Sequence, residues 1–233
     1  MPIIDLSLAI KGNTIPLDYG YALFGALSRI VPEIHGDRRI GVHPIRGIKR
    51  EPKRLTLVPQ SRLRLRMPSE EISRYLALIG IELDLDGSRL MIGFPQVHRG
   101  HEGRGRTEEA VRVEPLRPAV EVTSRLVTLG QIKEPAEFEE SLRRQLAGLG
   151  VAAEPSFFPS TDPRGRGGPE RRVLRIKDRK IVGFPIRISG LTADESLIVQ
   201  SEGLGSRRRM GCGVFVPVPD RITNVTKTVE PEA

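Results

Sequence analysis

Apolar positions along the first third of the chain change from a two-residue to a helical period, and each period predicts an element. Residues 3–10 alternate in part and predict a strand, closed by a turn at 11–13. From Asp18 to Ile30 the apolar residues recur at helical spacing, which predicts a helix with one buried face and Asp18 as its N-cap. Residues 40–48 then predict another strand.

The strand predicted around Leu63 and Leu65 has an unbroken alternation. Its leucines are expected to face the core, so that Arg62, Arg64 and Arg66 face out together. Their spacing gives a basic stripe roughly 13 Å long at about 3.3 Å per residue, enough to meet successive phosphates along one strand of nucleic acid. The alternative is an ordinary solvated strand face.

A helix that begins at 68–71 and a hairpin over 81–94 complete a βαββαβ order in the first half of the chain. Residues from about 98 to 117 are rich in Gly, Arg and Glu, which predicts a long loop or linker. We therefore expect an N-terminal domain over 1–105 and a C-terminal domain over 115–220.

The second half repeats this order of elements. It predicts a strand at 120–129, a helix at 135–149, a strand at 152–158, a hairpin within 173–188, a short helix at 192–200 and a last strand at 210–218. The run 160–172 is rich in Gly and Pro and predicts a mobile loop. The two halves together predict an α+β protein of two tandem ferredoxin-like domains.

The charge balance narrows the class of partner. The chain has 37 Lys+Arg against 29 Asp+Glu, a formal net charge of +8, which favours a polyanion such as nucleic acid over an acidic small molecule. Much of the positive charge is arginine, whose planar fork suits phosphate and guanine. Aromatic residues make up only 4% and Trp is absent, so stacking of successive single-stranded bases is disfavoured.

Several kinds of site are disfavoured by the residue types present. The single cysteine, Cys212, excludes an internal disulfide and a multi-cysteine zinc site. Glu82, Asp84 and Asp86 share a strand face but end in an Asp-Gly turn with no histidine nearby, so we expect no metal and no cofactor. The N-terminus does not resemble a signal peptide and no apolar run approaches membrane length, which favours the cytoplasm and no membrane partner.

The most specific local pattern lies near the C-terminus. Gly203-Leu204-Gly205 and Gly211-Cys212-Gly213 bracket the five residues SRRRM and lead into the apolar run VFVPV. Glycines permit a left-handed backbone and a close approach to phosphates, and the arginines between them could contact a polyanion. The alternative is a glycine hairpin with solvated arginines.

Two Gly-hydrophobic-Gly triplets around a basic segment, near the end of a tandem βαββαβ chain, resemble the signature of the RAMP superfamily of CRISPR proteins. Within it the chain resembles the CRISPR-associated repeat endoribonucleases of the sixth Cas family, in the branch named for the MYXAN subtype. The resemblance rests on the stretches LDYGYALFGALSRIVPEIHG, IGVHPIRG, SRLRLRMP, SRLVTLG and GLGSRRRMGCGVFVP, which span the chain.

The resemblance implies that the chain binds the CRISPR repeat hairpin of a precursor RNA and cleaves it at the 3' base of the stem without metal. The product would carry a 2',3'-cyclic phosphate, and other Cas proteins of an effector complex would be further partners. The candidate RNA contacts are Arg39, Arg62, Arg64, Arg66, Arg125, Gly203, Gly205, Arg207, Arg208, Arg209, Gly211 and Gly213.

Cleavage of this kind needs a base for the 2'-hydroxyl, an acid for the leaving oxygen and cations for the phosphorane. Of the 4 histidines, His98 and His101 lie in the predicted linker and His43 in a predicted strand, where a core or edge histidine is the plainer interpretation. His35 follows the first helix, where the resemblance places a catalytic histidine, and we expect it to transfer the proton. The alternative is a polar residue that caps the helix end.

Related sequences of this branch have His-Gly-Tyr where this chain has Tyr19-Gly20-Tyr21, so Tyr19 is a second catalytic candidate that could orient or donate. Arg38, with Arg29 and Arg39, could act by electrostatics alone. Two rival functions stay open at this stage. One is a RAMP subunit that binds a crRNA complex without cutting, and the other is a general structured-RNA binder, which does not explain the glycine pattern.

Overall fold

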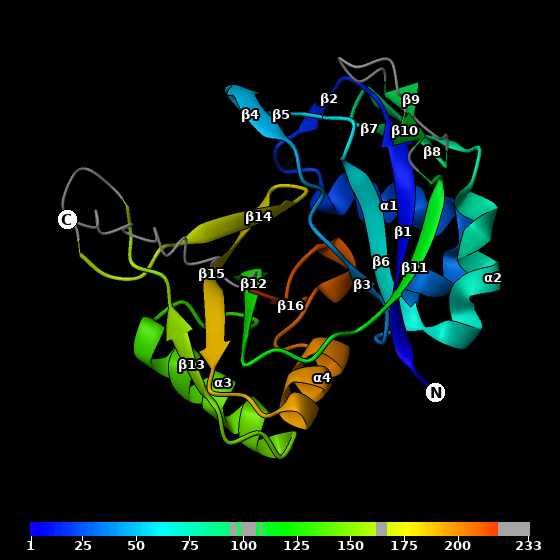
Figure 1. Ribbon diagram of the computed structural model, residues 1–233. Helices are drawn as coiled ribbons and strands as arrows, with labels where there is room; N and C mark the ends of the chain where they lie inside the picture. Colours follow the sequence, from blue (N-terminus) through cyan, green and yellow to red (C-terminus); the bar gives the residue numbers. More distant parts are fainter. Residues whose placement is uncertain (94–96, 99–105, 108, 162–166, 219–233) are drawn as a thin grey trace, which may run out of the picture.

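The computed structural model describes residues 1–93, 97–98, 106–107, 109–161 and 167–218, and it divides into two units, each with its own hydrophobic core. In Figure 1 the first unit lies at the upper right and the second at the lower left, with their sheets between their helices. This arrangement confirms the α+β class and the tandem ferredoxin-like fold.

The first unit has the strand order β3-β6-β1-β8-β7, and β11 also pairs with β1. Its elements are β1 (Ile3–Lys11), β2 (Thr14–Pro16), α1 (Gly20–Ile30), η1 (Pro32–His35), β3 (Gly41–Val42), β4 (Ile48–Glu51), β5 (Arg54–Thr56), β6 (Arg62–Pro68), η2 (Ser69–Glu71), α2 (Ile72–Tyr75), η3 (Leu76–Leu78), β7 (Glu82–Leu85), β8 (Ser88–Ile92), β9 (Val97–His98), β10 (Arg106–Thr107) and β11 (Val111–Pro115). The strands β3, β6, β1 and β8 give the order expected of βαββαβ, with every pair antiparallel.

The second unit has the order β13-β15-β12-β16, with β14 as a further partner of β15. Its elements are β12 (Glu121–Val127), α3 (Pro135–Gly148), β13 (Glu154–Phe157), β14 (Arg172–Ile176), β15 (Arg179–Ser189), α4 (Ala193–Glu202), η4 (Arg208–Met210) and β16 (Val216–Pro217). The four-strand order matches that of the first unit. Helices α3 and α4 lie on the side of this sheet away from the first unit (Figure 1).

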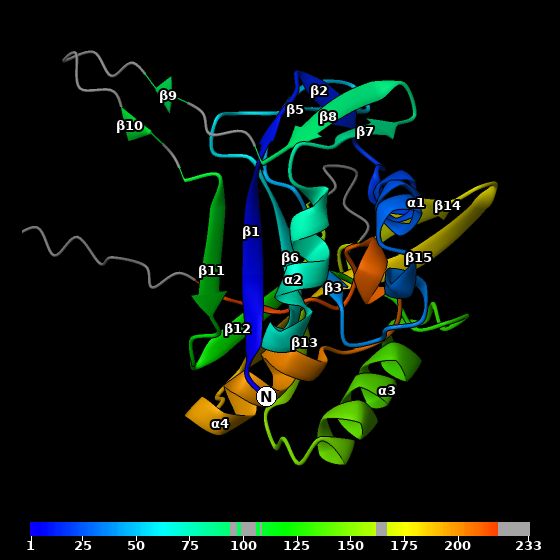
Figure 2. The same ribbon diagram turned by 90° about the vertical axis from the view of Figure 1, so that its right-hand side faces the viewer.

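The apolar face of each sheet explains these layers. In the first unit Leu63 and Leu65 of β6 are fully buried together with Leu23 and Leu27 of α1. The core therefore lies between the sheet and the helix that covers it. The predicted alternation of β6 therefore holds for its leucines. The opposite face of the first sheet is turned toward the second unit, since Arg66 of β6 bonds to the carbonyls of Gln200 and Phe215. In Figure 2, accordingly, α2 lies in front of the first sheet and strands β12 and β13 of the second unit lie behind it.

Three expectations about the first unit are wrong. Residues 40–48 are not one strand, because only Gly41–Val42 pairs with β6 and Pro44 has no N–H to continue the ladder. Asp18 is not the N-cap of α1; Tyr19 holds that place without a side-chain bond, and Asp18 instead accepts from the backbone N–H of Arg175. The stretch 98–117 is not all linker, since β11 pairs with β1 over Ile4–Leu8.

One expectation about the second unit also needs correction, and the expected mobility of the 160–172 loop stays a prediction. The strand expected at 210–218 shortens to β16, because Gly211 and Gly213 have φ of +88° and +65°, outside the β region. The two ends of the loop expected at 160–172 are joined by backbone hydrogen bonds. The N–H of Ser160 donates to the carbonyl of Gly168, and the N–H of Glu170 donates to the carbonyl of Phe158. Its central residues 162–166 lie outside the described residues.

The helices in the described ranges are all too short or too polar to span a lipid bilayer.

Candidate functional site

A basic cavity of about 450 Å³ lies between the open faces of the two sheets. Arg62 and Arg64 of β6 line it from the first unit, and Thr123 and Arg125 of β12 line it from the second. Its remaining lining residues are His43, Pro44, Ile45, Arg46, Val58, Gln60, Ser124, Phe158, Arg172, Pro185, Val214 and Val216. Five arginines and no carboxylate thus line the cavity among the described residues, so it attracts an anion.

The cavity arginines differ in how free they are. Arg62 donates from Nε to Ser7 Oγ (2.8 Å), and its Nη2 bonds to the carbonyl of Glu109 (2.9 Å). Arg64 has a distant ion pair with Glu114 at 3.9 Å. Arg46 and Arg125 are exposed, and their guanidinium groups have no hydrogen bond or ion pair to any residue that the structure describes. Arg46 and Arg125 are therefore the cations most available to a ligand.

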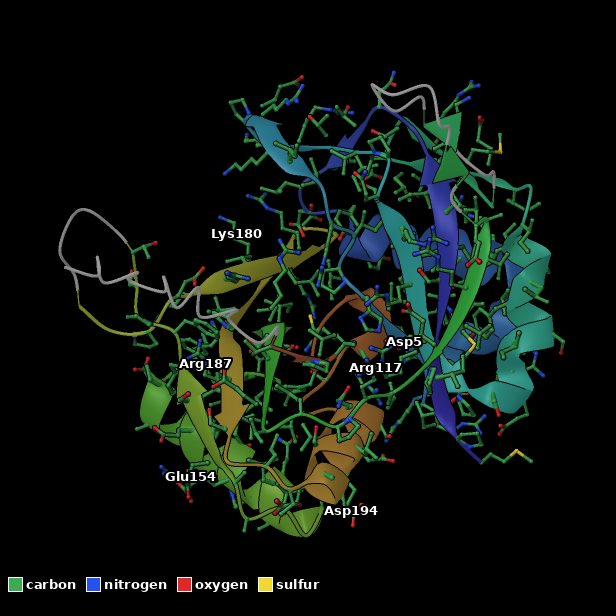
Figure 3. The ribbon with its side chains drawn as sticks, in the orientation of Figure 1. Asp5, Arg117, Glu154, Lys180, Arg187 and Asp194 are labelled. Carbon is green, nitrogen blue, oxygen red and sulfur yellow. The ribbon has the colours of Figure 1, made fainter. Side chains whose placement is uncertain are left out.

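Arg66 does not face solvent with Arg62 and Arg64, and this expectation is wrong. It lies on the predicted face of β6, but the second unit covers that face, and only 1% of Arg66 is exposed. Its Nε and Nη2 bond to the two oxygens of Asp5 at 2.8 and 2.9 Å, and Nη1 bonds to the carbonyls of Gln200 and Phe215. Arg66 therefore joins the two units and is not placed to meet RNA. Figure 3 shows Asp5 on the side of β1 that faces the second unit.

His43 completes this buried network. Its Nε2 lies 3.0 Å from Oδ1 of Asp5. Burial lowers the pKa of His43 to about 4 against the opposing effect of Asp5, so the ring is neutral at neutral pH. Hydrogen bonds from His43 and Arg66 outweigh burial and hold the pKa of Asp5 below its usual range. The interpretation of His43 as a core histidine fits this geometry.

His35, the first catalytic candidate, is exposed at the end of η1 and is held by three contacts. Its ring stacks on Phe24 of α1 with centroids 4.9 Å apart, and its Nδ1 lies 3.2 Å from Ser28 Oγ. Arg209 belongs to the glycine-rich segment, residues 203–213. It donates to the carbonyls of Ile34 and His35 and lies over the Phe24 ring. The fold thus brings His35 to the glycine-rich segment, 174 residues away along the chain.

The other catalytic candidates are less well placed. Tyr19 is only 5% exposed, and its hydroxyl accepts from the N–H of Ile45 and donates to the carbonyl of the same residue. Burial raises the pKa of Tyr19. Arg38 is exposed and unpaired within the described chain, whereas Arg39 is bound to Asp37, Glu70 and Glu71. Of these two arginines, Arg38 is therefore the one whose guanidinium group is available to bind a phosphate.

The glycines of the SRRRM segment face the protein interior. A Cβ on Gly203 would lie 2.3 Å from the carbonyl of Gly213, and a Cβ on Gly213 would lie 2.1 Å from that of Leu204. Gly205 has a φ of +80°, and a Cβ on it would lie 2.6 Å from the carbonyl oxygen of Thr128. These residues must be glycine for the two triplets to pack against each other and against the second sheet. Of these four glycines, Gly211 alone has room for a Cβ, which would meet no described atom closer than 3.7 Å.

The three arginines between the triplets point to different neighbours. Arg207 donates to Ser206 Oγ (2.8 Å), and Arg209 reaches the His35 segment. Arg208 lies close to Gly41 and Gly203, and its Nε and Nη2 are buried without a hydrogen-bond partner. Burial, with Arg66 nearby, lowers the pKa of Arg208 to about 10. Contact of these arginines with RNA stays a prediction.

Sequence reasoning missed some basic residues that the fold brings together. Arg46 and Arg172 line the cavity although they lie outside the alternating strand. The hairpin of β14 and β15 is edged by the exposed residues Arg171, Arg175, Lys177, Arg179 and Lys180. Repeated Arg and Lys on either side of the Asp178 turn were the available signal. Of the linker histidines, His101 lies outside the described residues, and only the backbone of His98 is described, in β9.

Burial raises the pKa of the Cys212 thiol to about 11, which keeps it protonated at neutral pH. No group of three or more metal-ligating side chains gathers within the described ranges.

Comparison with known proteins agrees with this fold. The family model described as Cas6 Crispr matches residues 4–104 and 107–220. The chain is 36% identical over 225 residues to the CRISPR-associated endonuclease Cas6 of Myxococcus xanthus (strain DK1622), covering 97% of this chain and 85% of that protein.

Solved structures share the fold at low sequence identity. One is a CRISPR associated protein Cas6, with a TM-score of 0.60, 14% identity and coverage of 93% of this chain and 99% of that one. Another, an RAMP protein binding different RNA substrates, has a TM-score of 0.61 and 14% identity over 94% and 100% of the two chains. Since the family model and the Myxococcus relative both extend over nearly the whole chain, the protein belongs to the Cas6 family.

Proposed function

We propose that this protein is a metal-independent endoribonuclease that binds the stem-loop of a CRISPR repeat and cuts the RNA at the 3' base of the stem. The product would carry a 2',3'-cyclic phosphate on the upstream fragment. The name of the Myxococcus relative supports the endonuclease class. Substrate, position and product are inferred from the family resemblance and from the site described above.

The observation that carries the proposal is the cavity lined by five arginines and no carboxylate among the described residues. Phosphates are the anions that arginine binds in a bidentate manner, and an RNA strand offers them at regular spacing. The lining also includes Phe158 and the exposed amide of Gln60, which can contact a base by its face or edge. Both sheets contribute, so an RNA bound there would contact both units.

Proton transfer is assigned to His35, because it is the exposed histidine whose ring is held by neighbours. A neutral imidazole can take the proton of the 2'-hydroxyl at neutral pH. Arg38, three residues along the chain from His35, is exposed and has no described partner, and it could stabilise the negative charge of the phosphorane. Tyr19, buried and bonded to Ile45, is left out of the proton transfer.

Incubation of the full chain with a labelled repeat stem-loop in excess EDTA tests this function. We expect one shorter 5' fragment, which phosphatase does not alter until acid opens its cyclic phosphate. The matched control is the same RNA with a single 2'-deoxy nucleotide immediately 5' of the cut. It should bind equally well and stay intact, because the attacking hydroxyl is missing.

Two outcomes would overturn the proposal. Binding without any cut would favour the alternative of a non-catalytic RAMP subunit. A cut that disappears in EDTA and returns with Mg²⁺ would show a metal-dependent nuclease instead.

A further inference from the structure

The hydroxyl of Ser28 has its single hydrogen already committed. Ser28 Oγ donates to the carbonyl of Phe24, one turn earlier in α1, over 2.7 Å. The same oxygen lies 3.2 Å from Nδ1 of His35. A hydroxyl has one hydrogen and two acceptor lone pairs, so Ser28 can only accept in this second bond. The hydrogen between Ser28 and His35 therefore belongs to Nδ1 of the histidine.

This bond fixes which nitrogen of the neutral ring is free. An uncharged imidazole has one N–H, and if Nδ1 carries it, Nε2 keeps its lone pair. No described residue has a hydrogen bond or ion pair with Nε2 of His35. Phe24 covers one face of the ring, and Arg209 holds the backbone carbonyl of His35, so the ring is held with Nε2 away from its partners.

We propose that Ser28 is a positioning residue that holds His35 as the Nδ1–H tautomer, with Nε2 as the nitrogen that accepts the proton of the RNA 2'-hydroxyl. The assignment rests on the endoribonuclease function proposed above. In the step, the 2'-oxygen forms a bond to phosphorus while its proton passes to Nε2. The bond from phosphorus to the 5'-oxygen breaks, and the 5'-oxygen takes a proton from solvent water. His35 then returns its proton to solvent.

The tautomer can be measured without RNA. In ¹⁵N-labelled full-length protein, two-bond ¹H–¹⁵N correlations distinguish a protonated from a bare ring nitrogen, and the His35→Ala variant identifies the signals of His35. At a pH where the ring is neutral, we expect Nδ1 protonated and Nε2 bare. In Ser28→Ala the proton should shift toward Nε2. Ser28→Thr keeps a hydroxyl that can bond to the carbonyl four residues earlier, and it should restore the original tautomer.

The kinetic experiment asks whether the tautomer matters for cleavage. Ser28→Ala should slow single-turnover cutting roughly three- to tenfold, the range expected for one hydrogen bond between neutral groups, and Ser28→Thr should restore the rate. Stem-loop affinity should not change. Alanine is the best helix former, so Ser28→Ala should not unfold α1, and circular dichroism checks this.

The outcomes separate this proposal from the function on which it rests. Nε2 protonated in the parent protein, or a tautomer that Ser28→Ala leaves unchanged, would overturn the role of Ser28 whatever the enzyme does. If Ser28→Ala cuts at the parent rate while His35→Ala does not cut, positioning by Ser28 is refuted although the function stands. If the parent chain fails to cut any repeat RNA, the function fails, and the tautomer spectrum still decides whether Ser28 holds the ring.

Discussion

At the scale of single residues, Arg66 is a buried side chain that joins the two units, although the local pattern assigned it to RNA. Alternation in β6 correctly placed Arg66 on the face opposite Leu63 and Leu65, but it could not show that a second unit covers that face. The burial of Arg66 comes from residues 200 and 215, far away in the chain. A two-residue period contains no information about such long-range contacts.

Replacing Arg66 should therefore affect stability before it affects RNA. Arg66→Leu leaves the carboxylate of Asp5 buried beside His43 and removes a donor from two carbonyls, which we expect to lower the free energy of unfolding by about 3–5 kcal/mol. Urea unfolding measures this. The control is Arg64→Leu, because the side chain of Arg64 is 34% exposed and its ion pair is 3.9 Å long; it should cost about 1 kcal/mol or less. Equal destabilisation by the two substitutions would contradict the assignment.

The buried His43 predicts sensitivity to acid. Its pKa is about 4 in the folded chain and near 6.5 when unfolded, so the unfolded state binds a proton more readily between these values. Stability is present in full above pH 6.5 and should fall by about 3 kcal/mol as the pH drops toward 4. Charged groups around the ring are Asp5, Arg64 and Arg66.

Thermal melting at a series of pH values checks this sensitivity. His43→Gln keeps an N–H donor for Asp5 but cannot titrate, so its melting temperature should fall less over the same interval. Below pH 4 both proteins should lose stability together. The pKa of Asp5 is lower in the folded chain than in the unfolded one, so the unfolded state takes up a proton first. A His43→Gln variant with the same pH profile as the parent would refute this origin.

His35 should matter for chemistry and little for binding. We expect His35→Ala to slow single-turnover cleavage by at least roughly a hundredfold, because removal of a general base costs 10²- to 10⁴-fold, with stem-loop affinity within a few-fold. Tyr19→Phe should change the rate much less, since that hydroxyl is bonded to Ile45. If His35→Ala cuts normally and Arg38→Ala does not, electrostatic stabilisation by arginine replaces proton transfer as the mechanism.

At the scale of elements, periodicity predicted those whose partners are local and missed those shaped by distant contacts. The helix at 135–149 and the hairpin turning at Asp86-Gly87 were found within one or two residues. The strand expected at 40–48 ends early because Pro44 has no N–H for the ladder, and the backbone groups of Ile45 are bonded to the Tyr19 hydroxyl. Likewise, β11 was missed because its five residues are mostly exposed and lie in a stretch that is otherwise rich in Gly, Arg and Glu.

The glycine-rich segment was recognised by its spacing, and in the structure its glycines have a packing role that the sequence did not show. Its spacing indicated the family correctly, but the close approach that its glycines allow is to the protein's own backbone. Gly205→Val should therefore displace the segment from β12 and weaken stem-loop binding more than Ser206→Ala, which loses one side chain's bonds to Thr128. Native electrophoretic titration with the repeat stem-loop compares the two affinities.

A second glycine separates backbone strain from collision. Gly130 also has positive φ, +52°, but a Cβ there meets nothing within 4 Å. Gly130→Val should thus show only the strain of about 1–2 kcal/mol, and Gly205→Val should lower the free energy of unfolding by more. If the two substitutions destabilise the protein equally, the glycine-rich segment moves away from Thr128 without loss of stability, and Gly205 is not needed for packing.

At the scale of the whole molecule, the arrangement of the two units creates sites that neither half contains. Arg66 bonds across the boundary to Gln200, and Arg209 bonds back to the His35 segment. The cavity takes its arginines from both sheets. Repeated element order predicted two similar units, but the orientation that turns their open faces together depends on these cross-boundary contacts. The sequence pattern of either half alone therefore could not locate the cavity.

This arrangement predicts which arginines govern the salt dependence of RNA binding. Arg46 and Arg125 belong to different units, are exposed at the cavity and have no described partner, whereas Arg207 and Arg209 are bonded within the protein. Removing one arginine that binds a phosphate should reduce the slope of log affinity against log salt by about 0.7–0.9. The pair Arg46→Gln and Arg125→Gln should then flatten the slope by about 1.5, while the melting temperature stays near that of the parent.

The pair Arg207→Gln and Arg209→Gln should instead lower the melting temperature and change the slope less, because its first effect is to release the segment from Thr128 and His35. Arg89→Gln is the matched surface control, since the Arg89 side chain is 80% exposed and lies outside the cavity lining. It should change neither quantity. If the loop pair flattens the slope as much as the cavity pair, the loop arginines contact phosphates directly, and RNA must cross the glycine-rich segment as well as the cavity.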